Sequence, residues 1–195
     1  EMCIRDSDTY ALQPVARGYV ALMPTFLRTS VSNVFSNLDD ALIGANNLFQ
    51  GKPGNAISDF GRLLLNSTVG FLGVFDVATP IGLEKHEEDL GQTLGVWGFG
   101  DGPYLVLPLL GPSSLRDTSN LVTAYWLDPV NSIDRVAVRN SVKGLRLIDG
   151  RAQLLDAGQA LEDASLDKYI FMRDFYLQRR RSMVYYGTPP REKEN

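Results

Sequence analysis

The chain has 195 residues, enough for one domain with a hydrophobic core and short for two. Its composition, 44% hydrophobic and 22% charged, excludes global disorder, and a net charge of −4 gives no general basic surface for nucleic acid. One cysteine and one histidine exclude a disulfide framework, a cysteine-based zinc site and two-histidine metal sites. We therefore expect no metal and no cofactor.

The N-terminal part predicts helices separated by turns. Residues 1–7 show no periodicity, and we interpret them as foreign to the domain or disordered. The stretch Tyr10 to Pro24 has Pro14 near its start and closes with Pro24, which predicts a short helix between turns. A helical pattern follows from Thr25 to Asn37, and Asp39 is suited to cap a second helix that ends at Gly51.

A third helix is predicted after the turn Lys52-Pro53-Gly54, with Asn55 near its start. Its spacing is amphipathic, because polar and apolar residues occupy opposite faces. The polar face carries Asp59, Arg62 and Asn66, and the apolar face carries Ile57, Phe60, Leu63, Leu64 and Phe71.

Two segments are nearly free of charge. Leu63 to Leu83 carries only Asp76, and Leu90 to Leu115 carries only Asp101, with the charged segment Glu84 to Asp89 between them. No run of 18 apolar residues is present, so a conventional transmembrane helix is not predicted. The two segments suit either a hairpin dipped into a bilayer or a buried pair, and composition alone favours the buried pair.

The stretch from Asp89 to Asp117 is rich in glycine and proline but also in large apolar residues. Its Gly98-x-Gly100-x-Gly102 spacing lacks the strand, helix and later acid of a nucleotide-binding loop. We interpret it as a hinge loop or a static turn formed by Gly98, Gly100, Asp101, Gly102, Pro103 and Tyr104. Tyr104 to Leu110 alternates like a strand, but Pro108 argues against one.

Catalysis is not supported by the polar residues of this region. His86 and its acidic neighbours are adjacent on one charged turn and do not converge on an ion. Ser113 and Ser114 lack the glycine pattern of a nucleophile elbow. We therefore predict that the protein is not an enzyme.

Isolated polar residues in apolar surroundings predict structural roles. A lone carboxylate such as Asp76 or Asp101 must face water, a partner or a pore, and Asp76 alternatively caps a helix. Arg116 and Asp117 form an ion pair or lie exposed.

The C-terminal part predicts two helices. The first runs from Ser132 to Ala157 and stacks four cations on one face, either as a solvated surface or as a polar path for anionic headgroups: Arg135, Arg139, Lys143 and Arg146. The second begins near Ser165 and ends in Arg179, Arg180 and Arg181, for which we favour a surface position. We predict one helical domain over 8–187 and a tail over 188–195.

An ordered set of motifs resembles the VacJ/MlaA family of outer-membrane lipoproteins, over roughly Tyr10 to Arg180. These motifs are Asn33-x-Phe35-x-Asn37-Leu38, Asn66-Ser67-Thr68-x-Gly70, Gly73-x-Phe75-Asp76-Val77-Ala78, Gly91-x-Thr93-Leu94-Gly95, Gly102-Pro103-Tyr104-x-x-Leu107-Pro108, Leu115-Arg116-Asp117, Arg151-Ala152-Gln153-Leu154-Leu155-Asp156 and Asp167-x-Tyr169-Ile170.

The resemblance implies an all-α, ring-like assembly of amphipathic helices with a Gly/Pro-rich loop and a central polar channel. Family members lie on the periplasmic side of the outer membrane and take mislocalised phospholipids from its outer leaflet. They pass these phospholipids to a periplasmic lipid carrier and act beside trimeric porins. The alternative is a porin-associated scaffold that moves no lipid. The family's signal peptide, lipidated cysteine and first segment are not matched, so we expect an N-terminally truncated chain whose ring is in question.

This implied function reverses the preference for a buried pair and assigns roles to residues. We expect Phe60, Leu64, Phe71, Leu72 and Phe75 to face the membrane. The loop Gly98 to Tyr104 lines the opening, and the cations from Arg135 to Arg146 form the polar wall. Asn66, Asp76, Arg116 and Asp117 are expected to be structural polar residues.

Overall fold

A computed structural model describes residues 8–107, 110–158 and 168–189 of the chain. The N-terminal part begins with a π-helical segment, η1 (Asp8–Leu12), and continues as α2 (Gln13–Leu22). Two long helices follow, α3 (Thr25–Phe49) and α4 (Pro53–Thr68). The predicted segments 1–7 and most of the tail lie outside the described residues.

Helix α3 is one continuous helix, so the predicted break at Asp39 is wrong. No glycine or proline interrupts Thr25 to Ile43, and a capping residue inside a helix is free to use a tertiary partner instead. The Asp39 carboxylate forms an ion pair with Arg146. The helix ends at Phe49, just before Gly51 in a left-handed conformation (φ +74°).

A turn after α4 leads to the short 3₁₀ helix η2 (Thr79–Ile81) and then to α5 (Leu90–Val96). The Asp89 carboxylate caps α5 by accepting the backbone N–H of Gln92 at 2.8 Å.

A two-stranded antiparallel hairpin includes part of the stretch Tyr104 to Leu110, in which Pro108 argued against a strand. Strand β1 (Tyr104–Leu107) pairs with β2 (Gly111–Ser114), and Tyr104 lies opposite Ser114. Pro108 does not prevent this pairing, because β1 ends at the residue before it. Both strands are edges of the ribbon, and edge strands tolerate proline such as Pro112.

The remaining elements complete the chain. They are η3 (Asp117–Ser119), α6 (Asn120–Trp126), η4 (Pro129–Ser132), α7 (Val136–Gln153) and α9 (Lys168–Val184). Helix α7 begins later than the predicted Ser132, because Asp128 caps η4 through the N–H of Val130 at 2.9 Å and the backbone is extended at Ile133 and Arg135. Gly144 and Gly150 lie within α7 without breaking it.

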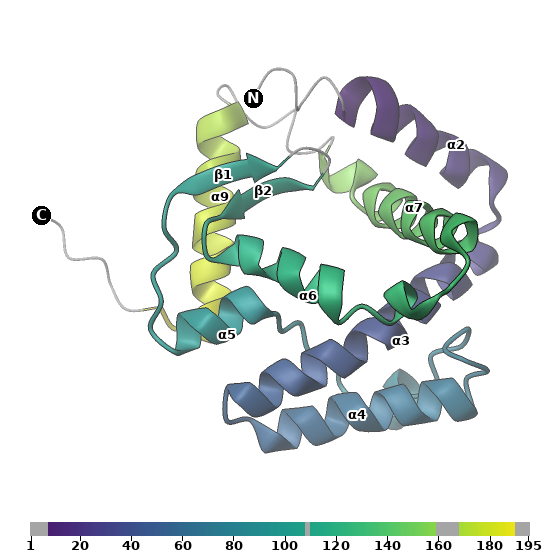
Figure 1. The fold of residues 1–195 in the computed structure, drawn as a ribbon, viewed down its shortest axis with the longest axis horizontal. Coiled ribbons are helices and arrows are strands. Elements are labelled where there is room, and N and C mark those ends of the chain that lie inside the picture. Colours follow the sequence, from purple (N-terminus) through teal and green to yellow (C-terminus); the bar gives the residue numbers. More distant parts are fainter. Residues whose placement is uncertain (1–7, 108–109, 159–167, 190–195) are drawn as a thin grey trace, which may run out of the picture.

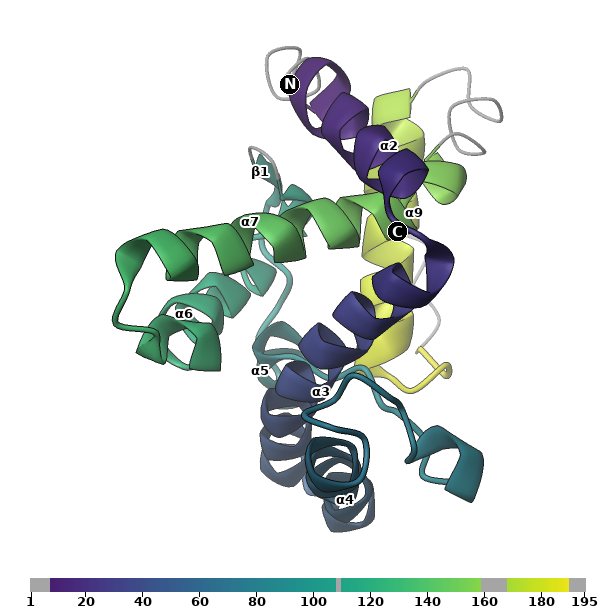
Figure 2. The same cartoon turned by 90° about the vertical axis from the view of Figure 1, so that its right-hand side faces the viewer.

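The elements follow a ring-like course (Figure 1). Helices α3 and α4 form an antiparallel pair (Figure 1), and α2 contacts α7, which it crosses at an angle in Figure 2. Helix α3 contacts α5, α5 contacts α6, η4 connects α6 to α7, and α7 returns to α3. Helix α9 packs against α5 and β2 and closes one side.

This arrangement confirms the predominantly helical fold, with the small hairpin as its only β element among the described residues. None of the helices in the described ranges is long and apolar enough to cross a membrane.

Two glycines provide a test of the local backbone. At Gly73 the φ angle is +85°, and an added Cβ would lie 2.8 Å from the Cβ of Asn37 on α3. We expect Gly73→Ala to lower the free energy of unfolding by about 2–4 kcal/mol. Gly144→Ala should instead raise it by about 0.5–1 kcal/mol, because Gly144 lies within α7 and nothing stands within 4 Å of its added Cβ.

Urea unfolding of both variants in mild detergent, followed by circular dichroism, measures the two effects. Equal stability of the two variants would contradict the close approach of the turn to α3.

Candidate functional site

The described side chains place polar groups inside and apolar groups outside. Buried polar and charged residues outnumber buried apolar ones among them, and three of the buried apolar residues are alanines: Ala16, Ala56 and Ala78. Large apolar side chains are exposed, including Leu22 at 84% and Trp126 at 73%. Charges inside a protein are tolerated only when paired, so the interior must be organised by ion pairs and hydrogen bonds.

The first such group, the Arg62 cluster, lies between α3 and the end of α4. It consists of Asp40, Arg62, Asn66, Asp76 and Thr79. Arg62 is 2% exposed, and its Nη2 lies 3.1 Å from Asp76 Oδ2 while its Nε lies 3.5 Å from Asp40 Oδ2. Its Nη1 donates to Thr79 Oγ1 at 2.9 Å and to the Leu83 carbonyl at 2.6 Å. One guanidinium therefore fixes the chain after α4 against α3.

Asn66 completes this cluster by binding backbone. Its Oδ1 accepts the N–H groups of Val77 and Ala78 at 2.9 and 3.0 Å, and its Nδ2 donates to Asp76 Oδ1 at 3.1 Å. Asp76 also accepts the N–H of Thr79 at 3.1 Å, so it caps a turn and pairs with Arg62 at once. The predicted structural residues Asn66 and Asp76 thus lie side by side.

Burial and hydrogen bonding act in opposite directions on these carboxylates. Burial raises the pKa of Asp76, but hydrogen bonds from Thr79, Asn66 and Arg62 outweigh it and hold that pKa at about 2. At Asp40, burial wins over the nearby Lys85 and Arg62, and its pKa is raised.

The charged segment Glu84 to Asp89 is docked onto α3 and α4 through His86 and Lys85. His86 Nδ1 lies 2.9 Å from Oδ1 of the fully buried Asp59, and Lys85 Nζ lies 3.0 Å from Asp40 Oδ1. These two carboxylates point inward from α4 and α3 and require partners, which the segment supplies. Within the described ranges, no group of three or more His, Cys, Asp or Glu residues could hold a metal ion.

The second group, the Arg180 cluster, joins α5, η3 and α9. Arg180 holds Asp89 through Nη1 and Nη2 at 2.6 and 2.8 Å, and Asp117 through Nε and Nη2 at 2.9 Å each. Tyr176 OH donates to Asp117 Oδ2 at 2.6 Å. Such paired, parallel contacts are the strongest that arginine makes. The predicted surface position of Arg180 is therefore wrong, whereas its neighbour Arg179 is exposed beside Glu87.

The pKa values follow from these contacts. Burial raises the pKa of Asp89 and of Asp117, but hydrogen bonds from Arg180 outweigh it and leave both lowered. Burial lowers the pKa of Arg180, and its hydrogen bonds to the two carboxylates more than reverse this. Burial and the hydrogen bond to Asp117 raise the pKa of Tyr176.

The predicted hinge loop is attached to the Arg180 cluster through Arg116. Arg116 Nη1 lies 2.6 Å from Asp101 Oδ1, and its Nη2 lies 3.1 Å from Asp117 Oδ1. The backbone N–H of Arg116 also donates to the Asp101 carbonyl at 3.1 Å. Gly98 and Gly102 have φ angles of +96° and +69°, which glycine adopts without strain. The single charge of the loop is thus its fastening point.

The remaining loop residues lead into the hairpin. The Pro103 carbonyl accepts the N–H of Leu115 at 3.0 Å, and no atom stands within 4 Å of an added Cβ at Gly100. The Tyr104 ring makes edge contacts with Tyr169 and Tyr176 of α9. Whether the loop moves as a hinge stays a prediction.

The four predicted cations at and within α7 divide into two kinds. Arg146 pairs with Asp39 of α3 and with Asp128 at 2.9 Å, so it fastens α7 to α3 and η4. In the described part of the chain no ion pair holds Arg135, Arg139 or Lys143. Arg139 and Lys143 on successive turns of α7, and Arg135 just before the helix, therefore remain available to an anion.

The predicted membrane-facing residues differ in exposure. Leu64, Phe71, Leu72 and Phe75 are all strongly exposed. Phe60 is half-buried, and its ring packs against α3 at Gly44, where an added Cβ would lie 3.1 Å away. Because Gly44 has no side chain, the two helices leave room there for the ring, and Phe60 belongs to their contact.

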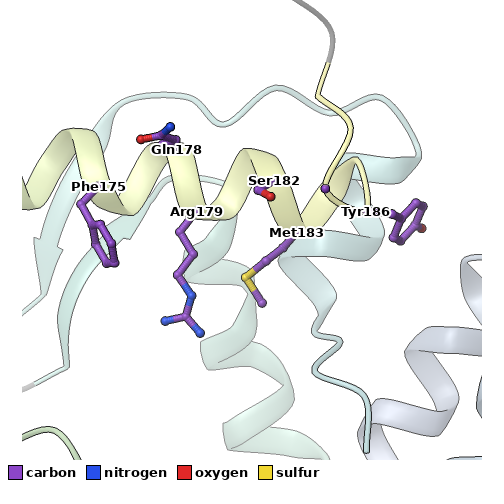
Figure 3. A pocket seen from close by; sticks show the side chains of 7 residues that line it. Phe175, Gln178, Arg179, Ser182, Met183 and Tyr186 are labelled. Carbon is purple, nitrogen blue, oxygen red and sulfur yellow. The ribbon is translucent and has the colours of Figure 1, made fainter. Parts of the chain in front are cut away.

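A shallow hollow of about 460 Å³ lies along the C-terminal half of α9 (Figure 3). It is lined by Phe175, Gln178, Arg179, Ser182, Met183, Tyr186 and Gly187. None of the predicted loop, cation or membrane-facing residues lines it, and Arg179 is paired with Glu87. The hollow is therefore separate from the predicted loop, cation and membrane-facing residues.

Fold and side-chain distribution together define a helical protein with an ion-paired interior and an apolar exterior. Comparison with known proteins then identifies its family. The model of the MlaA lipoprotein family matches residues 4–183, and the chain belongs to this family.

Characterised relatives share most of the chain. It is 33% identical over 193 residues to the intermembrane phospholipid transport system lipoprotein MlaA of Escherichia coli, covering 96% of this chain and 76% of that one. The protein of the same name in Shigella flexneri is 34% identical over 192 residues, with the same coverage. A structure solved to explain the maintenance of bacterial outer membrane lipid asymmetry matches with a TM-score of 0.79 and 32% identity, covering 94% of this chain and 95% of that one.

The Arg180 cluster supplies a matched pair of neighbouring variants. Arg180→Met leaves the half-buried Asp89 without its cation and the buried Asp117 with Arg116 alone, so we expect the free energy of unfolding to fall by about 3–5 kcal/mol. Arg179→Met removes only an exposed pair and should cost below about 1 kcal/mol. Urea unfolding in detergent measures both. Similar losses would show that the cluster is not the joint between α5, η3 and α9.

The lowered pKa of Asp117 predicts a pH effect. A carboxylate with a folded pKa below its unfolded pKa of about 3.9 stabilises above that value and loses this effect as the pH falls through the folded pKa. We therefore expect Asp117→Asn to be less stable than wild type at pH 6, by about 1–3 kcal/mol, and the gap to narrow toward pH 3.

Urea midpoints across this pH range, with the exposed Asp174→Asn as control, measure the gap. A gap that stays constant down to pH 3 would show that Asp117 is not held ionised by Arg180.

Proposed function

We propose that this protein transports phospholipids between membranes without covalent chemistry. It removes mislocalised phospholipids from the outer leaflet of the outer membrane and passes them to a periplasmic lipid carrier, which maintains lipid asymmetry. The observation that carries this proposal is the inverted side-chain distribution, with ionic clusters inside and large apolar residues outside. The names of its relatives in the phospholipid transport system support the same reading.

Apolar exposure on this scale is unfavourable in water and favourable in hydrocarbon. Since no described helix can cross a bilayer, short helices would lie within one leaflet with their apolar sides toward acyl chains. We place the protein on the periplasmic side of the outer membrane. The ion pairs around Arg62 and Arg180 would hold the helices together there, because they do not depend on water being excluded by an apolar core.

A polar path through the protein would carry the headgroup. Arg135, Arg139 and Lys143 have the chemistry for it, because phosphate is bound by charge-assisted hydrogen bonds and these cations are not paired with described carboxylates. Arg146 would hold the wall in place through Asp39 and Asp128. The Gly98 to Tyr104 loop would border the opening and move about Gly100.

The proposed partners are a phospholipid, a periplasmic lipid carrier and a trimeric porin. A transport system requires a component that receives the lipid, and a water-soluble carrier protein can take a lipid across an aqueous space. A porin would fix the protein at one place in the outer membrane.

Charge reversal on α7 tests transport directly. In a bacterium that lacks its own family member and is supplied with this protein, we expect Arg139→Glu/Lys143→Glu to raise outer-leaflet phosphatidylethanolamine several-fold, because a phosphate is repelled from the wall. Labelling of intact cells with an amine reagent that does not cross membranes measures this lipid. Arg173→Glu/Arg179→Glu on α9 is the matched control and should leave clearance unchanged.

Porin co-purification is measured on the same variants. Normal clearance by folded Arg139→Glu/Lys143→Glu would contradict a polar wall on α7. If all variants retain the porin and even deletion of the protein leaves lipid levels unchanged, the scaffold alternative holds and transport is wrong.

A further inference from the structure

The turn that follows α4 holds two bulky residues in left-handed backbone conformations. Phe71 has a φ angle of +53° and Leu72 one of +59°. For residues with a Cβ this conformation costs about 1–2 kcal/mol each, and two in succession are rare. Strain of this kind persists only where the surroundings fix the backbone, and it is concentrated at functional positions.

Two glycines and two asparagines fix this turn. An added Cβ at Gly70 would lie 2.2 Å from the Phe75 carbonyl oxygen, and one at Gly73 would meet Asn37. Asn33 of α3 donates to the Val74 carbonyl at 3.2 Å, while Asn37 donates to the Ser67 hydroxyl at 2.9 Å. The conformation is thus imposed by α3 and α4.

The strain is not offset by packing within the protein. Phe71 and Leu72 are each 73% exposed, the neighbouring Val69 is 69% exposed and Phe75 is 60% exposed. The fold therefore stiffens a turn in order to present two large apolar side chains outward. Their contact has to be with something other than the described chain.

The polar groups of this turn are hydrogen-bonded within the protein, which favours contact with hydrocarbon. The N–H groups of Leu72, Gly73, Val74 and Phe75 all donate to carbonyl oxygens within residues 66–71. The Thr68 hydroxyl donates to the Leu64 carbonyl at 2.7 Å. Backbone in contact with lipid must satisfy its polar groups internally, whereas a water-facing turn has no such need.

The segment around this turn also carries little charge. Asp76 is the only charged residue between Leu63 and Leu83, and its carboxylate is turned toward Arg62, Asn66 and Thr79. Acyl chains match a charge-poor surface whose backbone N–H groups from Leu72 to Phe75 are bonded within the turn. A folded protein partner would ordinarily add polar contacts around such residues.

We propose that Phe71 and Leu72 form a rigid wedge that inserts into the hydrocarbon of a phospholipid bilayer and sets the depth at which the end of α4 lies. The wedge rests on the proposed function, because it requires that the protein works at a membrane. It adds to the expected membrane-facing role of these two residues the backbone strain that keeps them pointing outward and the depth that they set.

Two double variants test the wedge by vesicle flotation. Phe71→Gly/Leu72→Gly removes both side chains, and glycine adopts the left-handed conformation freely. Phe71→Asn/Leu72→Asn keeps side chains that tolerate this conformation but makes them polar. Partitioning of the full chain into vesicles of phosphatidylethanolamine and phosphatidylglycerol should fall about tenfold for each residue and roughly 100-fold for each pair.

Thermal unfolding in detergent accompanies flotation. We expect the midpoint of the glycine pair to stay unchanged or rise, because strain is removed and no internal packing is lost. Tyr186→Gly is the control, since Tyr186 also has a left-handed φ angle (+52°) but contacts Lys52 and Gln50. It should lower the midpoint and leave flotation unchanged.

Each failure has its own signature. If wild type floats and both double variants float equally well, the wedge is wrong and the proposed function stands. If wild type itself stays in the aqueous fraction, both are wrong. If the double variants float normally but lose porin co-purification, the turn docks a protein and the bilayer assignment is overturned.

Discussion

The fold depends on pairing buried guanidinium groups with carboxylates from elsewhere in the chain. Arg62 joins α4 to α3 and to the turn before η2, while Arg180 joins α9 to the start of α5 and to η3. Few large apolar side chains are buried among the described residues, so ordinary core packing contributes little. Removing one partner of a buried pair lowers the free energy of unfolding strongly. The few buried apolar side chains contribute little that could offset this loss.

The same clusters explain how distant functional segments are positioned. Asp117 contacts Arg180 on one side and Arg116 on the other, and Arg116 holds Asp101 in the glycine loop. The loop is thereby connected to α9 through four charged side chains in sequence. Arg146 does the equivalent for α7 by joining it to α3. Under the proposed function, the moving loop and the polar wall are thus fastened to one frame.

Much of the helical fold follows from the sequence, but which face of each helix points inward does not. The spacing of Asp59, Arg62 and Asn66 correctly predicts that they share a face of α4. Periodicity cannot say which face points inward, and here the polar one does. The family resemblance supplied that orientation. Arg180 was missed because its two arginine neighbours make a helix-end cluster look like surface, and only tertiary structure brings Asp89 and Asp117 to it. The break assigned at Asp39 failed because capping residues also serve as ion-pair partners in mid-helix.

The ionic interior has a thermodynamic consequence of its own. The heat-capacity increment of unfolding grows with newly exposed apolar area and shrinks with exposed polar area. Here many large apolar side chains are already exposed and several charged ones are buried, so we expect that increment to be small for a chain of this length. We therefore expect the free energy of unfolding to vary little with temperature and to have a broad maximum, in contrast to proteins that rely on an apolar core.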